Sequence, residues 1–163
     1  MTDYTMTHPH YLFVYGTLKS PFGNHGLLMR HGSKFISEAR TMDKFTLTKD
    51  FPFVHRHVRA PALAYYQPYL GHVVGELYKV TDSGLEACDR LEGHPRFYCR
   101  TPATVEFGHV SAPQRVTAGI YLDQSLPPNF DKLLTPIDGK LEWGVARNPK
   151  LEASHPQFKR KKA

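Results

Sequence analysis

The sequence is poor in cysteine and has no long hydrophobic run. Its two cysteines, Cys88 and Cys99, stand in a chain of 163 residues. A chain of this length buries enough apolar surface to fold without cross-links, so we expect free thiols and a cytoplasmic location. No run approaches the roughly 18 apolar residues of a membrane-spanning helix. The polar extension over residues 1–10 lacks the apolar core of a signal peptide, so we expect neither secretion nor membrane contact.

The charge balance argues against a nucleic-acid-binding protein. Lys and Arg number 21 against 15 Asp and Glu, which gives a formal net charge of +6. Four of those positive charges lie in residues 159–162, so the rest of the chain carries only +2. A phosphate backbone is bound by a broad basic face. We therefore expect no nucleic-acid partner, and the remaining role for the tail is docking on an acidic protein.

Motifs that identify several large enzyme classes are missing. The sequence has no G-x-S-x-G, no phosphate-binding P-loop and no G-x-G-x-x-G, which excludes the commonest recognisable hydrolases, nucleotidases and dinucleotide-binding enzymes. Ten histidines suggest metal binding at first. However, the pairs His8/His10 and His55/His57 have no third ligand at a recognisable spacing. We predict no metal and no cofactor.

The chain length and the order of elements favour one α+β domain with a mostly antiparallel sheet or barrel. We assign residues 11–150 to this domain and residues 151–163 to a basic tail. The tail contains SHPQF, which is similar to part of a streptavidin-binding tag, so it is natural or a tag remnant. The expected elements are strands over residues 11–15, 34–49, 62–66 and 72–80, a short helix over 27–29, a helix ending at 92, and a hairpin over 97–107 and 115–122.

Both helices carry recognisable end signals. Asn24 can cap the first helix and Gly32 can end it. The second helix has three adjacent candidates for its N-cap, residues 81–83, and Gly93 ends it.

Glu92 is the most informative carboxylate in the sequence. If Leu85, Cys88 and Leu91 form the apolar face of the second helix, Glu92 falls four residues after Cys88 and shares that buried stripe. Desolvation and the negative end of the helix dipole both disfavour an anion there. We therefore predict a raised pKa and a role as general acid and base.

Structural roles are open for the same residues. Glu92 can pair with Arg90, Arg96 or Arg100, or point into water where the helix ends. Cys88 could be a nucleophile, but its place on an apolar helix face is more typical of a core residue.

The loop that follows the first strand is a second candidate feature. Its sequence is Gly16, Thr17, Leu18. A glycine there lets consecutive backbone N–H groups turn outward and hold an anion or a carbonyl oxygen. Turn geometry alone explains such a glycine equally well. Glu76, on the strand over residues 72–80, fits a structural, substrate-orienting or catalytic role.

Two groups of residues have a recognisable order and spacing. The first is FVYGTLK over residues 13–19, followed by Asn24 and His25. The second is GELY over residues 75–78, followed by LEGHPRFY over residues 91–98. Together they resemble the γ-glutamylamine cyclotransferase family of the AIG2-like superfamily, with its FVYGTLK opening, GE-x-Y strand and LE-x-x-P-x-x-Y segment. The likeness covers about residues 11–122 and, more weakly, residues 147–149.

The resemblance implies the γ-glutamyl cyclotransferase-like fold, a small, mostly antiparallel β-barrel flanked by short helices, with a substrate cavity at one mouth. In that family the carboxylate matching Glu92 is the catalytic acid and base. The residues implied to bind substrate, largely through the loop backbone, are Tyr15, Gly16, Thr17, Leu18 and Tyr98. Asn24 and Glu76 are expected to hold these substrate-binding residues in position without contacting the substrate. Residues 20–23 and the long segment 50–71 depart from the family pattern.

The implied reaction is intramolecular aminolysis of a γ-glutamyl amide, which yields 5-oxoproline and a free amine. The substrate's own α-amine is the nucleophile, so the protein needs no Ser or Cys nucleophile. We expect a transferase or lyase of this kind that takes a small γ-glutamyl substrate and is a monomer or weak dimer. The alternative is a binding or regulatory module that holds a γ-glutamyl or amino-acid-like ligand without turnover.

Overall fold

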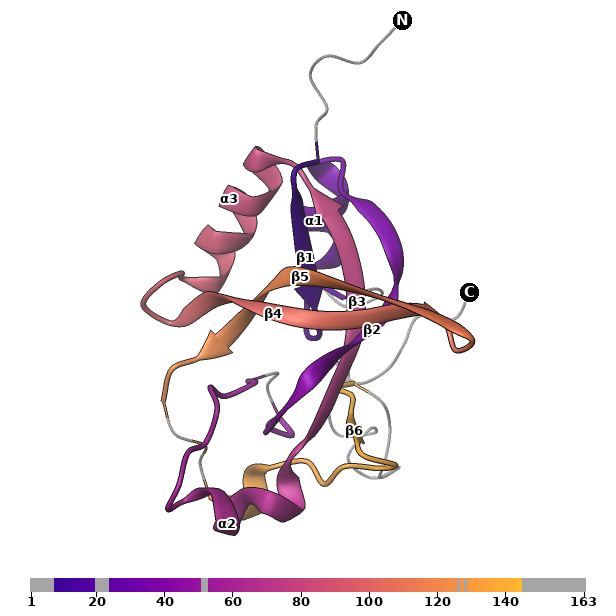
Figure 1. Ribbon diagram of the computed structural model, residues 1–163. Coiled ribbons are helices and arrows are strands. Elements are labelled where there is room, and N and C mark those ends of the chain that lie inside the picture. Colours follow the sequence, from indigo (N-terminus) through magenta and orange to yellow (C-terminus); the bar gives the residue numbers. More distant parts are fainter. Residues whose placement is uncertain (1–7, 20–23, 51–52, 126, 128, 145–163) are drawn as a thin grey trace, which may run out of the picture.

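The computed structural model describes residues 8–19, 24–50, 53–125, 127 and 129–144 (Figure 1). The elements in chain order are β1 (His10–Val14), α1 (His25–Arg30), β2 (Lys34–Phe45), α2 (Leu63–Tyr66), η1 (Gln67–Tyr69), β3 (Gly71–Val80), α3 (Asp82–Glu92), β4 (Tyr98–His109), β5 (Ala112–Asp123), η2 (Phe130–Lys132) and β6 (Lys140–Leu141). The predicted basic tail, the likeness over residues 147–149 and most of the polar extension lie outside the described residues.

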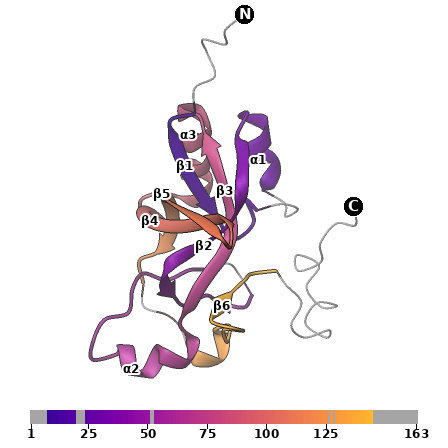
Figure 2. The ribbon, with the colours of Figure 1, turned by 45° about the vertical axis from the view of Figure 1, so that its right-hand side comes forward.

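Five strands close into a small barrel, seen from two directions in Figure 1 and Figure 2. The strand order is β1–β5–β4–β2–β3, β3 pairs with β1 to complete the circle, and β6 lies alongside β3. The pairings β1–β3, β2–β3, β2–β4 and β4–β5 are antiparallel. The contact between β1 and β5 is parallel, with Leu12 opposite Gly119. The predicted α+β fold with a mostly antiparallel barrel and short helices is confirmed.

Strand β1 contributes to two hydrophobic clusters. Phe13 and Tyr15 belong to the cluster that fills the barrel. Leu12 and Val14 belong to a second cluster, which includes buried residues of α1 and α3. The division follows from the strand itself, because successive side chains face opposite sides of a sheet. The loop that leaves β1 is therefore held by packing on both faces of the strand.

A close approach of β1 and β3 depends on Gly75. A Cβ atom added at Gly75 would lie 2.3 Å from the carbonyl oxygen of Val14 and 2.8 Å from the ring of Phe13. Real Cβ atoms essentially never come so close to backbone. The glycine of the GELY group is thus required by the spacing of the two strands.

Helix α3 has well-formed ends. Thr81 is the N-cap residue, and its hydroxyl accepts a hydrogen bond from the Gly84 N–H at 3.0 Å. At the other end Gly93 adopts the left-handed conformation with φ 67° and closes the helix. These ends make Glu92 the last helical residue.

The expected apolar face of α3 needs one correction. Leu85 and Cys88 are buried, but Leu91 is 44% exposed. Residues 85, 88 and 92 follow the i, i+3, i+7 spacing of one helix face, whereas residue 91 is turned away from it. The buried stripe therefore continues to Glu92 and bypasses Leu91.

The predicted strand over residues 62–66 is wrong, because Leu63–Tyr66 forms helix α2 and continues into η1. Aromatic residues favoured a strand in isolation. In the structure the Tyr66 ring packs on Phe130, with 5.0 Å between ring centroids, and its hydroxyl donates to the carbonyl of Pro127. Tertiary packing decides the local conformation here.

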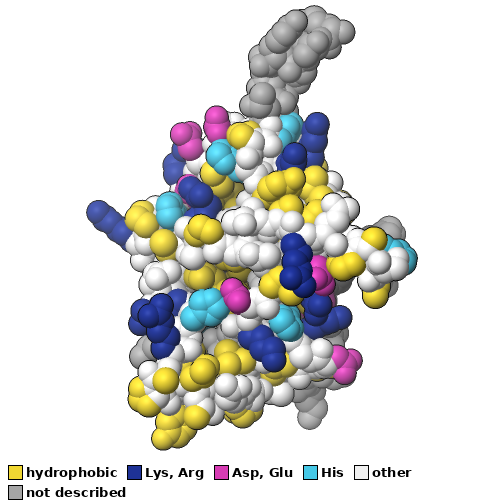
Figure 3. All heavy atoms as spheres, viewed as in Figure 1, with side chains coloured by type: hydrophobic (Ala, Val, Ile, Leu, Met, Phe, Trp, Pro, Cys, Tyr) yellow, Lys and Arg dark blue, Asp and Glu magenta, His cyan; other side chains and the backbone are white. Residues whose placement is uncertain are grey.

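The surface gives no sign of a broad basic face in the view of Figure 3, where Lys and Arg side chains are scattered among acidic, apolar and other polar groups. None of the helices in the described ranges is long and apolar enough to cross a membrane.

Candidate active site

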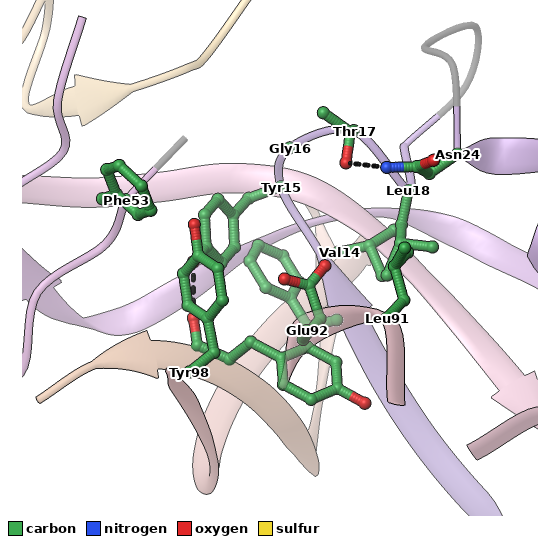
Figure 4. A pocket seen from close by; sticks show the side chains of 12 residues that line it. Val14, Tyr15, Gly16, Thr17, Leu18, Asn24, Phe53, Leu91, Glu92 and Tyr98 are labelled. Atoms are coloured by element: carbon green, nitrogen blue, oxygen red, sulfur yellow. Dashed lines mark hydrogen bonds between the residues drawn. The ribbon is translucent and has the colours of Figure 1, made fainter. Parts of the chain in front are cut away.

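A cavity opens between the loop after β1, the end of α3 and the start of β4 (Figure 4). Its volume is about 210 Å³. The lining residues are Phe13, Val14, Tyr15, Gly16, Thr17, Leu18, Asn24, Phe53, Leu91, Glu92, Tyr98 and Tyr121. They come from widely separated parts of the chain, so the cavity depends on tertiary structure.

The loop after β1 presents backbone N–H groups that are not used elsewhere. Within the described part of the chain, the N–H groups of Gly16, Thr17 and Leu18 donate no hydrogen bond. Other bonds fix the loop: the Asn24 N–H donates to the Thr17 carbonyl at 2.9 Å, and the Asn24 side-chain amide donates to the Thr17 hydroxyl at 2.8 Å. Backbone N–H groups that are held in place and have no acceptor in the described protein can hold an anion or a developing oxyanion.

Of the two roles expected for Asn24, the capping of the first helix by its side chain is not observed. It occupies the N-cap position of α1, but its side chain makes no capping hydrogen bond. The amide is used by Thr17 instead. Asn24 therefore stabilises the loop that lines the cavity.

Lys19 anchors the other end of the loop. Its side chain is only 4% exposed and lies 3.9 Å from a carboxylate oxygen of Glu142. The ammonium group donates to the carbonyl of Trp143 at 2.9 Å. In the sequence Lys19 was noted only as the last residue of the FVYGTLK group. No local pattern indicated that it contacts Glu142 and Trp143, which follow β6.

Glu92 lies at the end of α3, half-buried against the cavity. Burial raises the pKa of its carboxyl group to about 7. Among the described residues it forms no ion pair, so the alternative in which an arginine neutralises Glu92 is contradicted. A carboxyl group with a pKa near neutrality can both take up and release a proton at physiological pH.

Arg100, one of the three arginines considered as partners of Glu92, is held by another carboxylate. Its Nε and Nη2 atoms donate to Asp89 at 2.9 and 3.1 Å, and the Tyr121 hydroxyl donates to the same carboxylate at 2.6 Å. These bonds lower the pKa of Asp89 despite the opposing effect of burial. Asp89 therefore binds the positive charge that Glu92 would otherwise attract, and it ties α3 to β4 and β5.

Three tyrosines surround the carboxylate and remain neutral phenols. Burial is the main cause that raises the pKa values of Tyr15, Tyr98 and Tyr121. The Tyr15 hydroxyl donates to the carbonyl of Tyr121 and accepts a hydrogen bond from the Val54 N–H at 3.4 Å. The phenols thus add no negative charge near Glu92.

The structure brings most of the predicted site residues together and leaves one outside. Tyr15, Gly16, Thr17, Leu18, Asn24, Glu92 and Tyr98 all line the cavity. Glu76 is not among the lining residues, and it accepts a hydrogen bond from the Tyr78 hydroxyl at 3.1 Å instead. No cluster of three or more His, Cys, Asp or Glu side chains that could hold a metal ion occurs within the described ranges.

Three aromatic residues that line the cavity were not predicted as site residues: Phe13, Phe53 and Tyr121. Phe13 was recognised only as the first residue of the FVYGTLK group. Tyr121 could have been predicted, because side chains alternate along β5. Ile120 and Leu122 face the barrel interior, so Tyr121 lies on the other face of the sheet, toward α3. Phe53 gave no signal, since it lies in a segment rich in Pro and aromatics without periodicity.

The raised pKa predicts how stability depends on pH. Because the folded state disfavours ionised Glu92, its contribution to the free energy of unfolding is fully present below pH 4.5 and is lost as the pH rises through about 7. Glu92→Gln cannot ionise, so we expect the variant to gain up to about 3 kcal/mol over the wild type between pH 4 and pH 8. Chemical denaturation at both pH values measures this; a constant difference between the two proteins would show that Glu92 has an ordinary pKa.

The fold is a closed barrel with a cavity beside the loop after β1, and Glu92 is the carboxylate among the described residues that line this cavity. A family model described as gamma-glutamyl cyclotransferase, AIG2-like, matches residues 12–140. The chain belongs to this family.

Individual relatives agree with the family assignment. A gamma-glutamylaminecyclotransferase from Bos taurus is 31% identical over 145 residues, covering 85% of this chain and 82% of the relative. Gamma-glutamylaminecyclotransferase A from Danio rerio is 37% identical over 97 residues, covering 55% of each chain. The crystal structure of a mouse AIG2-like protein superposes with a TM-score of 0.64 at 25% identity, covering 80% of this chain and 87% of the mouse chain.

Proposed function

We propose that this protein converts a γ-glutamyl amide into 5-oxoproline and a free amine, with Glu92 as the catalytic acid and base. The observation that carries the proposal is the presence of two features in one cavity. The first is the Glu92 carboxyl group, which forms no ion pair with the described residues and has a pKa of about 7; the second is a lining loop whose N–H groups have no acceptor among those residues. Family membership supplies the reaction class.

The reaction balances without a co-reactant. Glu92 as carboxylate takes a proton from the substrate's α-ammonium group, and the freed amine attacks the δ-carbonyl carbon. The new C–N bond closes a five-membered ring, and the carbonyl oxygen becomes an oxyanion. When the oxyanion re-forms the carbonyl, the bond to the leaving nitrogen breaks. The α-nitrogen loses two protons and the leaving nitrogen gains two, carried in turn by Glu92.

The loop after β1 has two tasks in this proposal. Its free N–H groups, from Gly16 to Leu18, hold the substrate's α-carboxylate and stabilise the oxyanion. Such donors act best when they need not reorganise during the reaction. The bonds from Asn24 to Thr17 and from Lys19 to the Trp143 carbonyl fix the loop in advance.

A panel of substrates tests the proposal. The purified protein and its Glu92→Gln variant are incubated with γ-glutamyl amines and γ-glutamyl amino acids, and 5-oxoproline is followed by mass spectrometry. We expect release by the wild type and little or none by the variant. If neither protein releases 5-oxoproline while a substrate still raises the melting temperature, the cavity is a binding module without turnover.

A further inference from the structure

The cavity has two chemically different ends, with Glu92 between them. In Figure 4, Thr17 and Asn24 lie on one side of the Glu92 carboxylate, and Phe53 lies on the other, beyond Tyr98. The first end offers backbone N–H groups and polar side chains. The second end is formed by aromatic rings. A substrate whose γ-glutamyl group occupies the polar end must direct its leaving group toward the aromatic end.

Two of the tyrosine hydroxyl groups at the aromatic end are engaged by protein groups. The Tyr15 hydroxyl is bound to the Tyr121 carbonyl and the Val54 N–H. The Tyr121 hydroxyl is bound to Asp89 at 2.6 Å. With these polar atoms engaged elsewhere, the two side chains offer the cavity mainly apolar surface.

Phe53 and Tyr98 form a continuous aromatic wall at this end. Their ring centroids are 5.5 Å apart and the ring planes are inclined by 30°. This spacing is too small for a third ring to enter between them, so an apolar ligand would pack beside the pair. Phe53 comes from the segment over residues 50–71 that departs from the family pattern, whereas Tyr98 comes from the matching LEGHPRFY group.

Charge also limits what this end can hold. Within the described lining there is no Lys, Arg or His side chain, and Glu92 is negative when ionised. A carboxylate on the leaving group, next to the scissile nitrogen, would be buried without a positive partner and close to Glu92. Such burial is strongly unfavourable.

We propose that the leaving group is an uncharged, apolar body, best an aryl group on a short alkyl chain, that packs against Phe53 and Tyr98. Phe53 is then a specificity-determining residue for the amine. This inference rests on the proposed function, since it concerns the leaving group of the same reaction. It names the substrate class as γ-glutamyl arylalkylamines.

The test compares substrates that differ in one feature. γ-Glutamyl-2-phenylethylamine and γ-glutamylethylamine differ by the ring, and γ-glutamylphenylalanine adds an α-carboxylate to the first. We expect the wild type to prefer the phenylethylamide over the ethylamide by about 10–200-fold in kcat/KM, because a hydrophobic pocket discriminates by this much when a substrate lacks an apolar group that fills it. We expect γ-glutamylphenylalanine to be the poorer of the two aryl substrates.

Variants at Phe53 connect the preference to the wall. In Phe53→Ala the preference for the phenylethylamide, measured as the ratio of the two kcat/KM values, should fall to within about threefold of unity. Phe53→Leu keeps an apolar side chain and is the second variant in case Phe53→Ala does not fold. It should retain part of the preference for the phenylethylamide. Tyr65→Ala is the matched control, because Tyr65 is an aromatic residue of the same segment but is 72% exposed and does not line the cavity.

The outcomes separate the two proposals. If the wild type releases 5-oxoproline from none of the three substrates, the proposed function fails. If it releases 5-oxoproline but shows no preference for the ring, or keeps that preference in Phe53→Ala, the proposed function stands and the aryl subsite is refuted. Preference for γ-glutamylphenylalanine would refute the uncharged leaving group.

Discussion

Glu92→Gln should lower turnover of a γ-glutamyl amide by about 10²–10⁴-fold, while the protein remains folded. The substitution keeps the size of the side chain and removes its ability to carry a proton. Because Glu92 makes no ion pair among the described residues, no partner is left unsatisfied by the change. Initial rates at saturating substrate measure the effect on kcat, and circular dichroism verifies the fold.

Glu86→Gln is the matched control for this experiment. Glu86 lies on the exposed side of the same helix, α3, and does not line the cavity. Its turnover should equal that of the wild type. Near-normal turnover by Glu92→Gln would show that another group carries the proton, and Glu92 would then have to be reassigned.

Gly75→Ala should lower the free energy of unfolding by about 3 kcal/mol, the upper part of the range for overpacked sites. The added methyl group would lie 2.3 Å from the Val14 carbonyl oxygen, so β1 must move away from β3. Tyr15 and the loop that follows depend on β1, and a displacement of about 1 Å can reduce turnover by about 10²-fold. Urea denaturation and kcat/KM for the best γ-glutamyl amide measure both effects.

Gly26→Ala provides the comparison for Gly75. Gly26 is exposed in α1, and a Cβ atom there would find its nearest neighbour, the Arg30 guanidinium, at 3.8 Å. Alanine is favoured over glycine in helices by about 0.5–1 kcal/mol, so this variant should be as stable as the wild type or slightly more stable. Equal stability of Gly75→Ala and Gly26→Ala would mean that β1 and β3 can move apart without lowering the free energy of unfolding.

The sequence predicted those parts of the fold that depend on local patterns. These parts are strands β1 and β3, the hairpin of β4 and β5, and helix α3, which ends at Gly93. The strands follow from their residue patterns and the helix from its capping residues. The conformation of residues 62–66 could not be predicted in this way, since Tyr66 packs on Phe130 from a distant part of the chain.

The candidate site shows the same division. Cys88 and Glu92 could be placed on one helix face from their spacing. The state of Glu92, however, depends on whether an arginine pairs with it, and the sequence left Arg90, Arg96 and Arg100 open as partners. In the structure Arg100 binds Asp89, whose carboxylate also accepts a hydrogen bond from the Tyr121 hydroxyl. Such a choice requires the relative positions of α3, β4 and β5, which no local pattern contains.

The buried Lys19 sets a minimum length for the folded unit. The family match ends at residue 140, yet Trp143 is 1% exposed within the barrel cluster, and its carbonyl accepts a hydrogen bond from Lys19. A chain cut at the family boundary would lose that acceptor and uncover part of the barrel interior, and an ammonium group buried without its partners is strongly unfavourable. We therefore expect the folding unit to extend beyond residue 140, because Trp143 is buried in the barrel and supports the loop after β1 through Lys19.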